Sequence, residues 1–161
     1  MGMFCDFFIR SKNLEDVKDI IVNTILKEEI VRIYDSIDTV LKDNENQDGL
    51  DITFGAFTVF LRLLDEDDAK LKSNIYRIDL NCSIHFSIFH NEADWGHQIM
   101  KFIGCIMQRM SADCVFEDYG VPVIIRKSGQ VTVDESRSTR LVSFPYKELN
   151  LSYTEGDIVL Y

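Results

Sequence analysis

The chain alternates strictly between apolar and polar side chains from Tyr76 to Ile88. Successive side chains of a β-strand point to opposite faces of its sheet, so this period predicts one long strand with a buried face and a wetter face. The apolar stripe contains Tyr76, Ile78, Leu80, Cys82, Ile84, Phe86 and Ile88, and the polar stripe contains Arg77, Asp79, Asn81, Ser83, His85 and Ser87. The fold must therefore supply an apolar layer that packs on one side of this strand.

Two amphipathic helices are predicted to supply that layer. Asn13 with Asp16 forms a helix start, and apolar residues recur at helical spacing from there to about Lys27. A second cap occurs at Asn91 to Asp94, and a second helix follows it and ends near Ser111. Its apolar stripe consists of Trp95, Ile99, Phe102, Ile103, Ile106, Met107 and Met110.

Further strands are predicted before and after the alternating segment. Met3 to Ile9 and Ile52 to Leu64 are rich in β-branched and aromatic residues, and the acidic segment Asp65 to Asn74 would join the second of these to the alternating strand as a hairpin turn. Residues Ile30 to Lys42 fit a helix or a short strand. Asp43 to Gly49 is a polar loop.

The C-terminal third favours short antiparallel strands. Three segments have strand composition, with Ser128-Gly129 as the tight turn between the last two: Cys114 to Phe116, Val121 to Lys127 and Val131 to Asp134. The tail from Leu141 to Tyr161 is predicted to form another hairpin around Glu155-Gly156-Asp157.

This order of elements predicts a fold class. The chain has 161 residues, which fits a single α+β domain over residues 1–161. Strand, helix, paired strands, helix and strand is the βαββαβ order of a ferredoxin-like sandwich, here with extra C-terminal strands. Two helices would cover one face of an antiparallel sheet, and the other face would be solvated or covered by a partner.

The chain is strongly acidic, with 27 Asp and Glu against 17 Lys and Arg and a net charge of −10. This balance disfavours direct binding to nucleic acid or to an anionic membrane, and it favours association with a basic partner. No segment has the length of apolar sequence that a membrane span requires, and the start lacks the features of a secretory signal. We therefore expect a cytoplasmic protein with reduced cysteines.

No residue constellation predicts catalysis, a metal or a cofactor. His85, His90 and His97 lack the spacing that places two imidazoles on one metal ion. The adjacent acids Glu117 and Asp118 would point to opposite faces of a strand, and no glycine-rich phosphate loop occurs. The sequence thus predicts a binding protein with no catalytic residues.

Acidic residues concentrate between Asp35 and Lys70, where ten acids face three bases, whereas Arg126 to Lys147 holds five bases and two acids. Such loops can steer a basic partner. We predict partner-binding residues in the two acidic loops and on the polar stripe: Asp43, Glu45, Asp48, Asp65, Glu66, Asp67, Asp68, Arg77, Asp79 and His85.

Several segments carry a family resemblance. Met3 to Ile9 with Leu14 to Val17 resembles the opening of a group of bacterial immunity proteins, which protect a cell from its own contact-delivered polymorphic toxins. Cys82 to Ile88, Asp113 to Tyr119 and Ile125 to Val131 are similar to later parts of that group. The resemblance implies that the chain binds a cognate toxin domain, such as a nuclease, and occludes its active site. Members bind through a variable surface, so no binding residue is transferred by position.

Two alternatives remain open on the sequence. One is a small-ligand-binding or enzymatic domain that uses a sheet face around Arg77, Asp79, Asn81 and His85. The other is a homo-oligomer that buries the open sheet face against a second copy of the chain.

Overall fold

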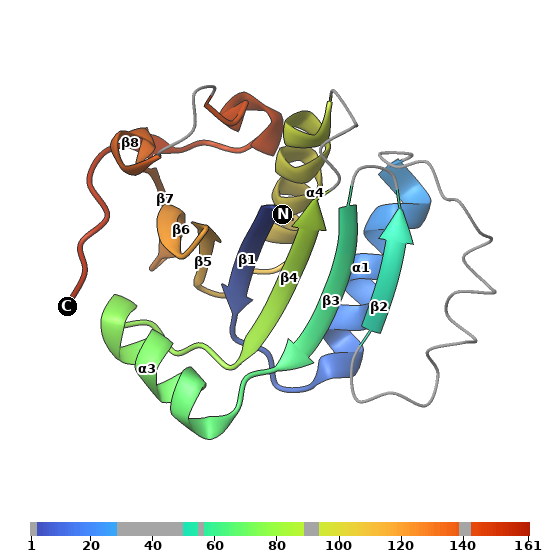
Figure 1. Cartoon of the computed structure of the whole chain (residues 1–161), viewed down its shortest axis with the longest axis horizontal. Coiled ribbons are helices and arrows are strands. Elements are labelled where there is room, and N and C mark those ends of the chain that lie inside the picture. The colour runs from blue at the N-terminus through green and yellow to red at the C-terminus, as the bar shows by residue number, and fades with distance from the viewer. Residues whose placement is uncertain (1–2, 29–49, 55–56, 89–93, 139–142) are drawn as a thin grey trace.

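The computed structural model describes residues 3–28, 50–54, 57–88, 94–138 and 143–161 (Figure 1). Strands and helices mix along the chain, which confirms the α+β class. In order, the elements are β1 (Met3–Ile9), α1 (Leu14–Glu28), β2 (Leu50–Phe54), β3 (Phe57–Leu63), α3 (Glu66–Tyr76), β4 (Cys82–Ile88), α4 (Trp95–Arg109), β5 (Cys114–Asp118), β6 (Val121–Lys127), β7 (Gln130–Val133), the 3-10 helices η1 (Glu135–Arg137) and η2 (Tyr146–Leu149), and β8 (Thr154–Glu155).

The strands form one sheet in the order β2-β3-β4-β1-β5-β6-β7-β8. The pairings are antiparallel from β2 to β7, and β8 adds to β7 in parallel, so the sheet is mixed. Strand β1 lies in the interior between β4 and β5, with Asp6 opposite both His85 and Glu117. This register sets the site described below.

Helices α1 and α4 lie side by side on one face of the sheet (Figure 1). Val17 and Ile21 of α1 and the apolar stripe of α4 share a buried core with the inward residues of the strands. At its centre the rings of Phe57, Phe86, Phe102 and Phe116 meet edge to face, with centroids 5.4–6.4 Å apart. Each such pair adds roughly 0.5–1.5 kcal/mol beyond simple burial.

The start of the first helix follows its predicted cap. The Oδ1 atom of Asn13 accepts a hydrogen bond from the N–H of Asp16 at 2.9 Å, and α1 begins at the next residue, Leu14. Helix α4 follows the predicted stripe, although the cap expected at Asn91 lies outside the described residues. The strands predicted from Cys114 to Asp134 are confirmed, and Ser128 and Gly129 turn with φ values of 52° and 81°.

The predicted strand from Tyr76 to Ile88 is correct only in its second half. Cys82, Ile84, Phe86 and Ile88 do face the helices, but Tyr76 ends α3 and the strand begins at Cys82. The expected hairpin turn from Asp65 to Asn74 is also wrong, because that segment lies within α3 and its cap. Asp65 accepts from the N–H of Asp68 at 2.8 Å, and three acids in the first turn favour the helix dipole.

The predicted long strand from Ile52 to Leu64 is two strands. Strand β2 folds back on β3, so that Phe54 lies opposite Phe57 and Thr53 opposite Thr58. The composition of the segment alone does not show where it turns. The ambiguous segment Ile30 to Lys42 and the loop Asp43 to Gly49 lie outside the described residues.

The tail does not form the hairpin predicted around Gly156. Instead β8 joins β7, and the buried carboxylate of Asp134 accepts hydrogen bonds from the Ile158 N–H and from Arg137, both at 2.9 Å. Burial alone would raise the pKa of Asp134, but the hydrogen bonds from Ser136, Ile158 and Arg137 hold it below its usual range. Held by these hydrogen bonds, the C-terminal segment runs near α3 (Figure 1).

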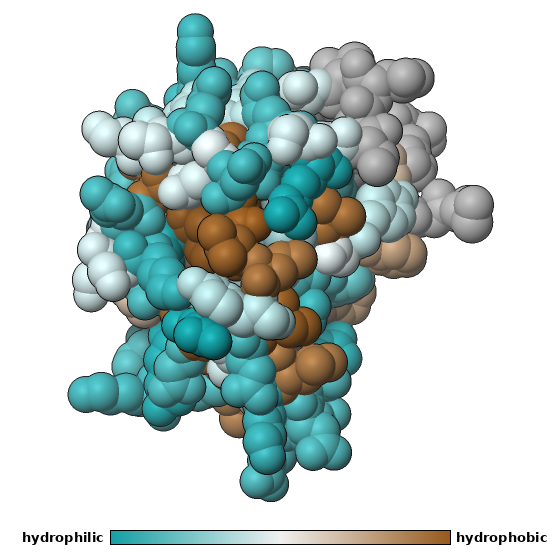
Figure 2. All heavy atoms as spheres, turned by 90° about the vertical axis from the view of Figure 1, so that its left-hand side faces the viewer, coloured by the Kyte–Doolittle hydropathy of each residue, from teal (hydrophilic) through white to brown (hydrophobic). Residues whose placement is uncertain are grey.

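Seen from the side on which the C-terminus lies, hydrophobic surface shows within a largely hydrophilic surround (Figure 2). The exposed apolar residues of the tail include Val159, Leu160 and Tyr161. Tyr161 is held in place, because the guanidinium of Arg77 lies 4.0 Å and the ammonium of Lys127 5.3 Å from the centroid of its ring. None of the described helices combines the length and the apolar composition needed to cross a membrane.

Candidate functional site

The sheet face opposite α1 and α4 divides into two parts. The covered part is a second buried cluster beneath α3 and the tail, formed by Phe8, Tyr76, Ile78, Leu80, Val115, Ile125 and Ile158. The open part has no such apolar layer among the described residues, and we define it by the partly or fully exposed side chains of Phe4, Asp6, Thr58, Phe60, His85, Ser87 and Tyr119. Sequence reasoning expected a single uncovered face.

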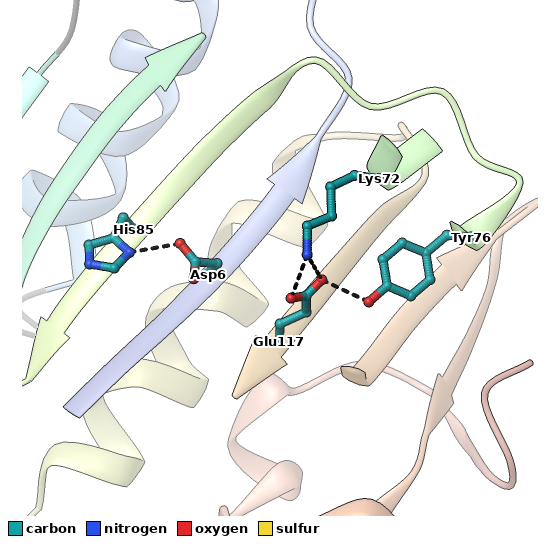
Figure 3. A network of polar contacts seen from close by, with 5 residues as sticks. All are labelled: Asp6, Lys72, Tyr76, His85 and Glu117. Carbon is teal, nitrogen blue, oxygen red and sulfur yellow. Dashed lines mark hydrogen bonds and ion pairs between the residues drawn. The ribbon is translucent and has the colours of Figure 1, made fainter. Parts of the chain in front are cut away.

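A buried acid anchors α3 to the covered part. Glu117 is 1% exposed, and its two carboxylate oxygens lie 2.9 and 2.8 Å from Nζ of Lys72 (Figure 3). The hydroxyl of Tyr76 donates to Oε2 of the same carboxylate at 2.7 Å. Burial raises the pKa of Tyr76 far above its ordinary value, and the negative charge of Glu117 adds to this effect.

The two adjacent acids of β5 point to opposite faces of the sheet, as successive residues of a strand do. Glu117 contacts α3, whereas Asp118 accepts a weak hydrogen bond from Sγ of Cys5, which belongs to the core beneath α1 and α4. The geometry agrees with the expectation that these carboxylates do not act on one substrate.

The open part centres on a hydrogen-bonded pair of side chains from neighbouring strands. Nδ1 of His85 lies 2.7 Å from Oδ1 of Asp6, and the two side chains are 31% and 28% exposed (Figure 3). Asp6 and His85 are direct cross-strand partners, so the sheet register itself brings them together. A neutral imidazole donates this bond when its proton is on Nδ1, and in that state Asp6 keeps its full negative charge.

Aromatic rings surround this pair. The ring of Phe4 stacks on His85 with centroids 5.4 Å apart, and Phe60 lies 6.0 Å from the same imidazole. Tyr119 meets Phe4 edge-on at 6.5 Å, and Phe4 and Tyr119 are 43% and 54% exposed. The open part therefore exposes aromatic surface around a carboxylate.

An unusual backbone conformation positions the side chain of Tyr119. It lies in the β5–β6 turn with φ of 51°, followed by Gly120 at 75°, and its N–H donates to the carbonyl of Phe4 at 3.3 Å. A tyrosine rarely adopts this left-handed conformation. The turn fixes its ring beside β1.

Most of the predicted binding residues lie elsewhere, and of the polar stripe only His85 and Ser87 lie on the open part. Arg77 is the C-cap of α3 and stacks on Tyr161, and Asp79 pairs with Arg10 at 2.8 Å. Asn81 bonds both the N–H and the carbonyl of Ser11, a structural role. The grouping of Arg77, Asp79, Asn81 and His85 in one site is therefore wrong, because β4 begins only at Cys82.

The acidic residues predicted to bind a partner divide into two sets. Asp65 caps α3, while Glu66, Asp67 and Asp68 form its exposed first turn. Asp43, Glu45 and Asp48 lie outside the described residues.

The structure adds binding candidates that sequence reasoning missed. Asp6 interrupts an otherwise apolar strand, and this acid could have been recognised from the sequence as a candidate site residue. The positions of Phe4 and Phe60 required the sheet order, which places β1 and β3 on either side of β4.

Other reactive groups lie away from this face. Cys5, Cys82 and Cys114 are buried, and burial raises the pKa of Cys114 to about 12. Cys105 lines a groove of about 360 Å³ between α4 and η2, together with Lys101 and Lys147. Within the described residues no three His, Cys, Asp or Glu side chains are grouped so as to hold a metal ion.

Comparison of the chain with protein-family models, with curated proteins and with solved structures finds no match. The functional argument therefore depends on the residues and their geometry.

Proposed function

We propose that this protein is a bacterial immunity protein that binds a cognate toxin domain through the open part of its sheet. The observation that carries the proposal is the contrast between two faces: α1 and α4 pack on one, while the other exposes Phe4 and Tyr119 around the Asp6–His85 pair. Exposed aromatic residues that surround a polar centre are typical of residues that dominate binding energy at protein interfaces.

The sequence resemblance to immunity proteins supports this class, and the net charge of −10 suits a basic partner such as a nuclease domain. In this proposal the protein acts in the cytoplasm of the toxin-producing cell. It blocks the toxin by covering its active site, which requires a surface and no catalytic group.

For the fold we propose a ferredoxin-like core built from β1, α1, β3, β4, α4 and β5. Its support is the strand order β3-β4-β1-β5 together with two helices on one face. Strand β2 and strands β6 to β8 would then be additions at the two edges, and α3 an insertion between β3 and β4. That insertion is what leaves only part of the second face open.

Co-expression with the toxic C-terminal domain encoded next to its gene tests the proposed function. The wild-type chain should restore growth, and the double variant Phe4→Thr/Tyr119→Asn should lose most protection. Threonine suits a strand, and asparagine tolerates the left-handed conformation of residue 119, so the fold should be kept.

The matched control is Leu71→Ser, which removes an equally exposed apolar side chain from α3, away from the open part. It should protect like the wild type. Absence of protection by the wild-type chain would reject the immunity function, and equal loss in both variants would reject the open part as the binding surface.

A further inference from the structure

We propose that the open part receives an arginine side chain of the toxin, with the guanidinium bonded to Asp6 and stacked against Phe4, Phe60 or the His85 ring. This inference rests on the proposed function, because it names the chemistry that the partner presents to the same surface. Three features of the described residues support it.

The first feature is an incompletely compensated carboxylate. Glu117, the neighbour of Asp6 across β1 and β5, has both oxygens matched by the ammonium of Lys72. Asp6 has only the imidazole of His85, bonded through Oδ1, as its recorded side-chain partner in the part of the chain that the structure describes. The Oδ2 side of a 28% exposed carboxylate is therefore suited to accept a donor from outside.

The second feature is the ring surface around that carboxylate. A planar guanidinium stacks on aromatic faces and bonds a carboxylate with its edge, which a lysine ammonium does not do. The chain already places guanidinium groups over rings at two positions: Arg62 lies 5.8 Å from the centroid of Phe60, and Arg77 lies 4.0 Å from that of Tyr161. Phe60 belongs to the open part, so a guanidinium of the chain itself already lies near one ring of this surface.

The third feature is the charge at the end of β3, where α3 begins with Glu66, Asp67 and Asp68 exposed. These acids attract a cationic segment and repel an anionic one. An anionic ligand would need basic groups on the face; of the two described cations near it, Lys72 is paired with Glu117 and only Arg62, beside Phe60, lies at its edge, against the four acids Asp6, Glu66, Asp67 and Asp68. The charges therefore favour a basic peptide segment over a phosphate or a carboxylate.

The test is an NMR titration of the purified full chain with Nα-acetyl-arginine amide, followed through the His85 ring signals and the amide signals of Phe4 and Ser87. Three probes provide the comparison: the arginine amide, its uncharged analogue Nα-acetyl-citrulline amide, and sodium acetate. Arginine should give saturable shifts with a dissociation constant on the order of 1 mM, as expected of one side chain. The signals of His97, on the opposite side of the sheet, should stay unchanged.

Two carboxylate variants test the role of Asp6. Asp6→Asn keeps the shape of the side chain and should weaken arginine binding at least fivefold at the Phe4 and Ser87 amides. Asp79→Asn removes an exposed carboxylate outside the open part and should bind like the wild type. A circular dichroism spectrum equal to that of the wild type establishes that each variant is folded.

An equal response to citrulline, a stronger response to acetate, or unchanged binding by Asp6→Asn would overturn the inference. The outcome is separable from that of the co-expression test. If the wild-type chain protects against the toxin and arginine does not bind, the immunity function holds and the arginine site is wrong. If arginine binds and no toxin is neutralised, the site holds and the function is wrong.

Discussion

Asp6 and Glu117 are neighbours on one sheet face, but they differ in their exposure to solvent and in their partners. They pair across β1 and β5, yet Glu117 is 1% exposed and Asp6 has a side chain that is 28% exposed. The difference comes from α3, which supplies Lys72 and Tyr76 to Glu117, whereas Asp6 bonds His85 of β4. One carboxylate therefore belongs to the folded structure, and the other is available to a partner.

This contrast has a physical consequence. Burying a charge costs several kcal/mol unless a counter-charge and hydrogen bonds compensate for it. Glu117 has both a counter-charge and hydrogen bonds, so we infer that it stabilises the folded state. Asp6 bonds a partly exposed imidazole and is itself 28% exposed to solvent, so little stability should depend on it. The predictions below measure this difference.

The largest effect is expected for Glu117→Gln. The change removes the charge that compensates Lys72, and loss of one partner of a buried pair costs about 2–4 kcal/mol here, less than for a fully enclosed pair because Lys72 is 26% exposed. Urea unfolding of the wild type and the variant measures the change. The double variant Glu117→Gln/Lys72→Met should recover part of the loss, and a double variant less stable than the single one would contradict the pairing.

A smaller effect is expected for Tyr76→Phe, which removes one buried hydrogen bond to a carboxylate and should cost about 1.5–3 kcal/mol. Its pH dependence has a definite sign. The pKa of Tyr76 is raised in the folded state, so above the ordinary tyrosine pKa of about 10 the unfolded chain loses a proton that the folded chain keeps. Stability should therefore fall above about pH 10.

The pH-dependent part is measured as the difference between the two proteins. Unfolding free energies of the wild type and of Tyr76→Phe, determined from pH 8 to pH 11, should converge at the alkaline end. A constant difference over the whole range would show that the fold does not raise the pKa of Tyr76.

Sequence patterns succeeded where one element determines its own structure. Leu14 to Glu28 forms a helix where an apolar stripe and a start signal coincide locally, and Trp95 to Arg109 forms one along its apolar stripe. The alternation from Tyr76 to Asn81 failed, because a period of two does not distinguish a strand from the end of a helix and its exit. There the cap at Asp65 and the left-handed Arg77 decide the structure.

The site was harder to predict than the fold. His85 was selected for its strand, but Asp6 and Phe4 come from the other end of the chain and reach it only through the pairing of β1 with β4. The placement of Arg77 and Asp79 on one strand with His85 was wrong, because that strand begins only at Cys82. When strands distant in sequence pair to form a site, the spacing of residues within one segment does not predict which residues meet there.

The smallest effect on stability is expected for Asp6→Asn. An exposed pair contributes about 0–1 kcal/mol, and asparagine can still accept a hydrogen bond from the His85 ring, so its urea midpoint should stay close to that of the wild type. The same variant should lose binding to the toxin, whereas Glu117→Gln should lose stability first. A loss of stability by Asp6→Asn as large as that of Glu117→Gln would remove the contrast, because both carboxylates would then serve the fold and the open part would lack a group free for a partner.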